Sequence, residues 1–209
     1  MSDTTMVAVV GFAGALVAAV IGGIITGRYT LKGVKEAHAN DVAMQRENEE
    51  NLVRSLMQSL HDEIDTLWHT YHNNIGNAVE TLQDNQPFLR YYPVTQDYFT
   101  VYNANAILIG RISDHDLRRQ IVIAYTKARG LIDSFRLNND FLNKYEYWDF
   151  VYNETLQPAH RSAMMAYRDT LVNYARVIKE MHNDMRREVE TLIRMLNRFG
   201  VIHDRNISQ

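Results

Sequence analysis

The sequence predicts an all-α protein, in which an N-terminal transmembrane helix is followed by a cytoplasmic bundle of about four long helices. Only three prolines and ten glycines interrupt the 209 residues, which favours helix over strand and turn. Residues Thr4–Gly27 carry no charged side chain. Beyond residue 51, apolar residues recur every three or four positions, as they do on amphipathic helices.

Composition excludes several classes of protein. Apolar residues make up 46% and charged residues 22% of the chain, which is typical of a folded protein rather than a disordered one. The net charge of −3 gives no basic field for nucleic acid, so we do not expect a nucleic-acid partner. The absence of cysteine excludes disulfides and thiolate zinc sites. The chain lacks the nucleotide-binding and hydrolase motifs, so no cofactor is expected.

Residues 1–27 are predicted to form the transmembrane segment. A helix over Thr4–Gly27 is about 36 Å long, enough for a hydrocarbon layer of about 30 Å. A cleaved signal peptide needs a basic start and a shorter apolar stretch, whereas Asp3 is the one charged side chain before this run. We therefore expect a retained single span.

The charges that flank this segment predict its orientation. Arg28, Lys32 and Lys35 follow it, and no lysine or arginine precedes it. Because positive charge stays on the cytoplasmic side, we expect a single-pass protein of the bacterial inner membrane. Its N-terminus would lie outside and its C-terminal domain in the cytoplasm, with membrane lipid as one partner.

Small residues form two strips at four-residue steps along the predicted span. The oligomerisation residues on these strips are Gly14, Ala18 and Gly22, and Gly11, Ala15, Ala19 and Gly23. In lipid, helices associate through close backbone contact at small residues. Since each chain has one span, the strips predict a homo-oligomer, and two strips favour a ring over a dimer. A passive anchor is the alternative.

The remaining chain is divided into a polar stalk or linker, residues 28–51, and the helical bundle, residues 52–209. The first bundle helix is predicted from Leu52 to Leu82, where apolar residues step by three or four. The segment Asp84–Pro93 is predicted to be a loop because it holds two prolines. A second helix is expected over Thr95–Ile109.

Three further segments complete the predicted bundle. A helix is expected to start at Ser113, which together with Asp116 resembles a capping box, and to end at Leu137 before Asn138 and Asn139. Residues 140–156 are expected to form a short helix and a packed loop. The last helix is predicted over Pro158–Phe199 because proline suits a first helical turn.

One helical arc gathers residue types that bind metals. His61, Asp65, His69 and His72 fall within about 80° of one another on a helical projection, at spacings suited to a metal site. The arc lies away from the apolar face, so these side chains are expected to face solvent, another subunit or a lumen. A solvated helix face and a pH-sensitive contact are the alternatives.

Arginine and histidine also recur at a spacing of five or six positions. The pairs Arg176–His182 and Arg198–His203 resemble the catalytic Arg…His motif of HEPN ribonucleases, which are helical bundles. That resemblance implies that arginine stabilises charge on a phosphate while histidine handles protons. The polar residue that follows the HEPN arginine is absent, since Val177 and Phe199 occupy that position.

The layout of the chain resembles the single-span, HEPN-like membrane accessory proteins of type VI-B CRISPR systems. The resemblance is carried by the span Val7–Thr26 and by Arg198 and His203. It implies a ring-forming membrane pore that acts in antiviral defence against phage.

Two further hypotheses come from other classes of protein. One is a membrane-tethered ribonuclease that uses the Arg–His pairs above. The other is a non-catalytic helical adaptor for an unknown protein partner. Whether the chain is an enzyme stays open at this point.

Overall fold

The computed structural model describes residues 3–94 and 98–199, and for residues 3–21, 24 and 25 it describes the backbone alone. The described chain is all-α, as predicted, and contains no strand. It divides into two units, residues 1–52 and residues 53–209.

The first unit belongs to a single helix. Helix α1 covers Asp3–Tyr71 and continues without a break through Gly33. From residue 26 to residue 52 its described side chains are exposed, apart from the half-buried Val42. The stretch predicted as a stalk or linker is therefore helical and solvated on all sides. In the described part of the chain, no helix is both long and apolar enough to cross a membrane.

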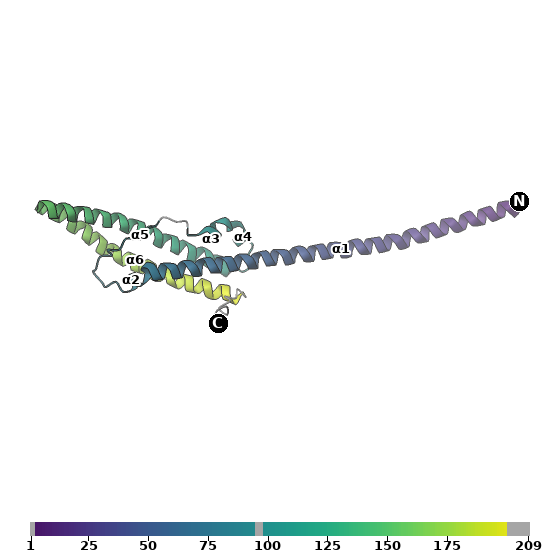
Figure 1. The fold of residues 1–209 in the computed structure, drawn as a ribbon. Helices are drawn as coiled ribbons and strands as arrows, with labels where there is room; N and C mark the ends of the chain where they lie inside the picture. Colours follow the sequence, from purple (N-terminus) through teal and green to yellow (C-terminus); the bar gives the residue numbers. More distant parts are fainter. Residues whose placement is uncertain (1–2, 95–97, 200–209) are drawn as a thin grey trace, which may run out of the picture. The chain divides into compact units, whose positions relative to one another are not determined.

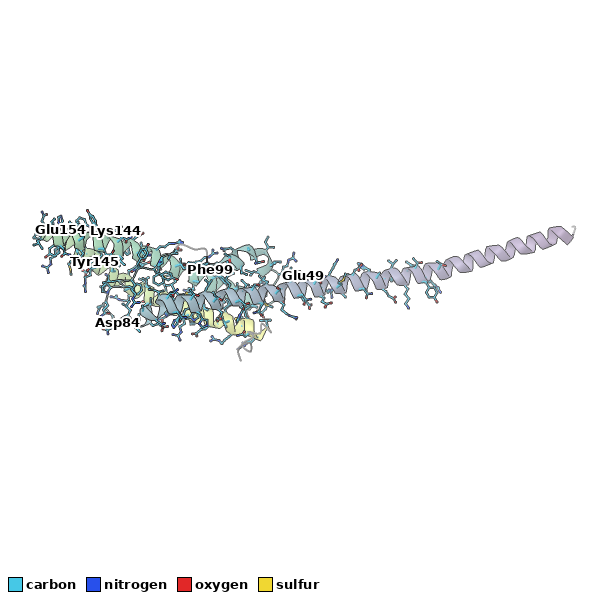
Figure 2. All side chains as sticks on the ribbon, viewed as in Figure 1. Glu49, Asp84, Phe99, Lys144, Tyr145 and Glu154 are labelled. Carbon is cyan, nitrogen blue, oxygen red and sulfur yellow. The ribbon has the colours of Figure 1, made fainter. Side chains whose placement is uncertain are left out.

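The second unit is a bundle made chiefly from the C-terminal part of α1 and from two further long helices, α5 (His115–Thr155) and α6 (Pro158–Arg198). Helices α5 and α6 form an antiparallel hairpin and lie side by side (Figure 1). Figure 2 shows Lys144, Tyr145 and Glu154 near the end of this hairpin, away from Phe99. The described bundle thus has three long helical segments rather than four.

Short elements connect these helices. After α1, a π-helical turn η1 (His72–Gly76) leads into α2 (Asn77–Glu80). A loop follows, and then α3 (Thr100–Ala104) and α4 (Ala106–Ile109). The single helix predicted over residues 95–109 is wrong for the described residues, because the chain bends at Asn105, where the backbone leaves the helical region.

The predicted end of a helix at Leu137 is also wrong. Helix α5 continues through Asn138 and Asn139 to Thr155, and both asparagines are buried. Their side chains bind the loop instead of capping a helix. Asn139 donates to the Tyr92 carbonyl at 2.7 Å and accepts from the Tyr92 N–H at 3.2 Å, while Asn138 donates to the Phe88 carbonyl at 3.2 Å.

Helix ends agree with local capping chemistry. Asp114, not Ser113, caps α5, because its Oδ1 accepts from the Leu117 N–H at 2.7 Å. Pro158 occupies the first turn of α6, as predicted. At the other end of α5, Leu156 adopts a left-handed conformation with φ of 50° and so ends the helix.

The core lies where the faces of the three long segments meet. Its members are buried apolar side chains, and those with no solvent exposure include Leu60 and Ile64 of α1, Leu117, Ile121 and Phe135 of α5, and Ile178, Val189 and Leu192 of α6. Truncating one such side chain to alanine typically costs 2–5 kcal/mol. One buried position on this face of α6, His182, is polar, and it lies at the centre of the candidate site.

Candidate functional site

The candidate site is centred on His182, a histidine in the core face of α6. His182 lies four residues after Ile178 and three before Met185, and both neighbours are buried core residues. The three-and-four spacing places all of them on one face of the helix. The side chain of His182 has no solvent exposure, so its two ring nitrogens need partners inside the protein.

Two residues from distant parts of the chain provide these partners. The Tyr71 hydroxyl lies 2.7 Å from His182 Nδ1, and Glu80 Oε1 lies 3.1 Å from His182 Nε2. A carboxylate only accepts hydrogen bonds, so Nε2 donates to Glu80 and Nδ1 accepts from the Tyr71 hydroxyl. This arrangement fixes one tautomer of a neutral imidazole.

Arg186 completes the network through Glu80. We call this set of four residues, Tyr71, Glu80, His182 and Arg186, the His182 network. Arg186, one turn after His182, donates to Glu80 Oε1 at 3.0 Å and also to Glu190 at 2.9 Å. The guanidinium is half-exposed. The network therefore runs from a buried tyrosine to a charge at the surface.

The turn η1 supplies the local geometry. It follows Tyr71 directly and ends at Gly76, and α2 then presents Glu80 to α6. A Cβ atom at Gly76 would lie 3.2 Å from His72 Nδ1, 3.2 Å from Tyr71 Cε1 and 3.5 Å from His182 Cε1. Glycine thus leaves room for the three rings.

Aromatic rings cover the network. The Trp68 ring stacks on His72 at a centroid distance of 5.5 Å and contacts His182 at 5.9 Å. His72 Nδ1 lies 3.8 Å from Glu80 Oε1 and has no hydrogen-bond partner within the described part of the chain. Rings of this kind exclude water from the imidazole of His182.

Burial determines the protonation states of His182 and Tyr71 within the network. It lowers the pKa of His182 below its ordinary value of 6.5, and the opposing effect of Glu80 is smaller. Burial also raises the pKa of the Tyr71 hydroxyl. Both groups are therefore neutral near pH 7. A closed, neutral and fully hydrogen-bonded pair is suited to holding helices together.

The predicted catalytic pair Arg176–His182 is not brought together. Six helical residues separate the two side chains by about 120° around the helix axis, and Arg176 is exposed while His182 is buried. Arg176 instead lines a shallow hollow beside the loop after α2. Of the other pair, Arg198 is exposed at the end of α6, and His203 lies outside the described residues.

The predicted metal arc does not form a ligand cluster. No group of three or more His, Asp or Glu side chains in the described chain could hold a metal ion. His61 is buried at 2% exposure, so its predicted position facing solvent is wrong. Asp65 pairs with His69 at 3.5 Å, and His72 turns toward Glu80 because the helix changes its winding at η1.

The predicted oligomerisation residues are described in part. Gly22 and Gly23 are exposed, and a Cβ at either position would meet nothing within 4 Å. The side chains of the others lie outside the described residues; these are Gly11, Gly14, Ala15, Ala18 and Ala19.

The sequence pattern singles out His182 but not its hydrogen-bonding network with Tyr71, Glu80 and Arg186. One signal was available, because His182 falls at a core position of its helix and a buried imidazole requires hydrogen-bond partners. The partners themselves come from a turn that the apolar spacing does not encode. Comparison with known proteins found no matching family model, no similar curated protein and no similar solved structure.

Proposed function

We propose that the protein is a self-associating single-span membrane protein whose helical bundle is not a catalyst. The observation that carries the proposal is the uncharged run Thr4–Gly27 with its two strips of small residues. The backbone over this run is helical from Asp3 onward, which is the conformation that a span and a helix–helix contact both need.

The accessible glycines support self-association. Gly22 and Gly23 leave open space where another helix backbone could approach. Close approach of two backbones gains van der Waals contact that larger side chains would prevent. A second copy of the chain carries the same strips and is the simplest partner.

The His182 network favours a binding or scaffolding role for the bundle over ribonuclease chemistry. A general base needs access to its substrate, whereas His182 is fully buried and bonded on both ring nitrogens. Membrane permeabilisation in phage defence, which the resemblance implies, is the activity we propose for the assembled form.

Replacing Gly11, Gly14 and Gly22 together by leucine tests self-association. We expect the mass of the complex in mild detergent to fall to that of one chain, because leucine keeps the backbones apart. Gly33→Leu is the matched control, since Gly33 also lies in α1 with open space around it but outside the uncharged run. A triple variant that keeps the mass of the wild-type complex would refute the proposal.

A second experiment addresses the assembled form and the ribonuclease alternative together. Expression of the wild-type chain is expected to depolarise the inner membrane, and the triple leucine variant is expected not to. Arg198→Ala and His203→Ala are expected to leave depolarisation unchanged. Loss of the effect in these two variants, with cellular RNA cleaved only by the wild type, would instead favour the ribonuclease.

A further inference from the structure

A cavity of about 220 Å³ lies between the last turns of α1, the residues just before α3, α5 and α6, and it opens to the surface at Thr70. Five aromatic side chains and a methionine are among the residues that line it: Tyr71, Tyr92, Tyr98, Phe99, Phe135 and Met185. Protein cores are packed nearly as densely as organic crystals and hold few voids larger than a water molecule. Because this cavity is larger than one water molecule and opens to the surface, a small molecule can enter it, and it is a candidate ligand site.

The described part of the wall is mostly apolar and uncharged. No charged side chain is among the described residues that line it. Tyr71 directs its hydroxyl to His182 and so presents its ring to the cavity. Burial, with Tyr98 nearby, raises the pKa of Tyr92 to about 12, so this hydroxyl is neutral near pH 7.

The aromatic wall also determines the shape of ligand that fits. The rings of Tyr92 and Phe135 lie 5.0 Å apart, and the Tyr71 and Tyr92 rings meet edge to face at 6.5 Å. Offset and edge-to-face contacts are the arrangements that aromatic rings prefer, and the sulfur of Met185 adds a favourable partner for a ring. A flat ring meets such partners on several sides.

We propose that this cavity binds a small, uncharged aromatic molecule. An apolar cavity of about 150 Å³ stays dry and takes a benzene-sized ligand, so a cavity of about 220 Å³ takes about nine non-hydrogen atoms on the same scale. That is the size of a fused pair of rings such as indole. The inference concerns the bundle alone and does not depend on self-association.

Thr70 provides a way to block the cavity without disturbing the core. Its side chain is exposed and forms part of the wall, so the cavity reaches the surface there. Thr66 lies one helical turn earlier, is also exposed and does not line the cavity. Thr70→Phe and Thr66→Phe are therefore a matched pair.

Equilibrium dialysis of indole against the full-length chain, held in an amphipathic polymer with the polymer alone as the blank, tests the proposal. We expect saturable binding of one indole per chain. Thr70→Phe should weaken it about tenfold or more, while Thr66→Phe should bind as the wild type does. Circular dichroism melting of both variants verifies that they fold.

Benzoate provides the second arm, because it offers an aromatic ring with a negative charge that an apolar wall does not accept. We expect no saturable binding of benzoate. The proposal is overturned if indole does not bind the wild type, if the two phenylalanine variants bind it equally well, or if benzoate binds as tightly as indole.

Discussion

The phenolic oxygen of Tyr71 lies 2.7 Å from Nδ1 of His182, and this hydrogen bond joins residues 111 positions apart in the chain. It connects the last residue of α1 to the middle of α6 inside the core. Because His182 is fully buried, no water is available to replace the hydroxyl if it is removed. The bond should therefore contribute measurably to the stability of the bundle.

Replacing Tyr71 by phenylalanine removes this hydroxyl and keeps the ring. The change leaves a buried imidazole nitrogen without a partner, which typically costs about 2 kcal/mol. We expect a loss of that size in the free energy of unfolding, measured on the full-length chain by urea denaturation. Tyr147→Phe is the control, because Tyr147 is 60% exposed. Equal stability of the two variants would show that the hydrogen bond contributes nothing.

The same histidine predicts how stability depends on pH. Burial holds the pKa of His182 in the folded protein below 6.5, the ordinary value that the unfolded chain retains. Below that pH the unfolded chain takes up a proton that the folded chain does not, so stability is full above about pH 7.5 and falls as the pH drops through 6.5. The slope approaches about 1.4 kcal/mol per pH unit.

Urea denaturation at about pH 8 and about pH 5.5 measures this slope, and the unfolded pKa of histidine places the window. His182→Gln keeps a donor and an acceptor but does not titrate, so its slope should be shallower than that of the wild type. The groups that face His182, namely Tyr71, His72, Glu80 and Arg186, stay in place in both proteins. Identical slopes would contradict the assignment.

Apolar spacing and proline chemistry predict much of this fold because both act locally. Pro158 and the three-and-four repeat predict α6, and its bounds agree with the structure to one residue. Asn138 and Asn139 led to a wrong helix end because their contacts are not local. Asparagine disfavours helix interiors through local competition for the backbone, but here the amides bind a loop some 47 residues away, and that tertiary contact outweighs propensity.

Two features of the structure depend on backbone geometry that the sequence pattern does not encode. One is the cap of α5, since Ser113 and Asp114 are adjacent and are both good capping residues, and only the backbone geometry shows that Asp114 is the cap. The other is the candidate site, where the π-helical turn His72–Gly76 determines the position of Glu80 relative to His182. This change of helical winding over five residues alters which side chains face α6, and the spacing of apolar residues does not predict it.

Asn139 gives a third prediction, since its amide makes two hydrogen bonds with the backbone of Tyr92. Asn139→Ala removes both and should free the loop between α2 and α3 from α5. We expect faster proteolytic cleavage of this loop and a loss of about 2 kcal/mol in stability. Asn143→Ala, one turn later on the exposed face of α5, should change neither. Unchanged cleavage in the Asn139 variant would mean that other contacts hold the loop.

Glu63 provides the last prediction, because its carboxylate on α1 takes the place of a capping residue for α3. The N-cap of α3 is Phe99, which has no side chain able to accept a hydrogen bond. Glu63 instead accepts from the N–H groups of Val101 at 2.7 Å and Tyr102 at 3.1 Å. The Tyr125 hydroxyl donates to the same carboxylate at 2.9 Å, so one charged group binds α1, α3 and α5 together.

Glu63→Gln keeps the size of this side chain but removes the charge and turns one acceptor into a donor, which would then face N–H groups that also donate. An anion at a helix N-terminus is also favoured by the helix dipole. We expect a loss of about 2 kcal/mol in stability and faster hydrogen exchange at the Val101 and Tyr102 amides. Glu146→Gln on the exposed face of α5 should leave both unchanged. If exchange at the two amides stays slow in the Glu63 variant, α3 is held by its apolar contacts and not by the carboxylate.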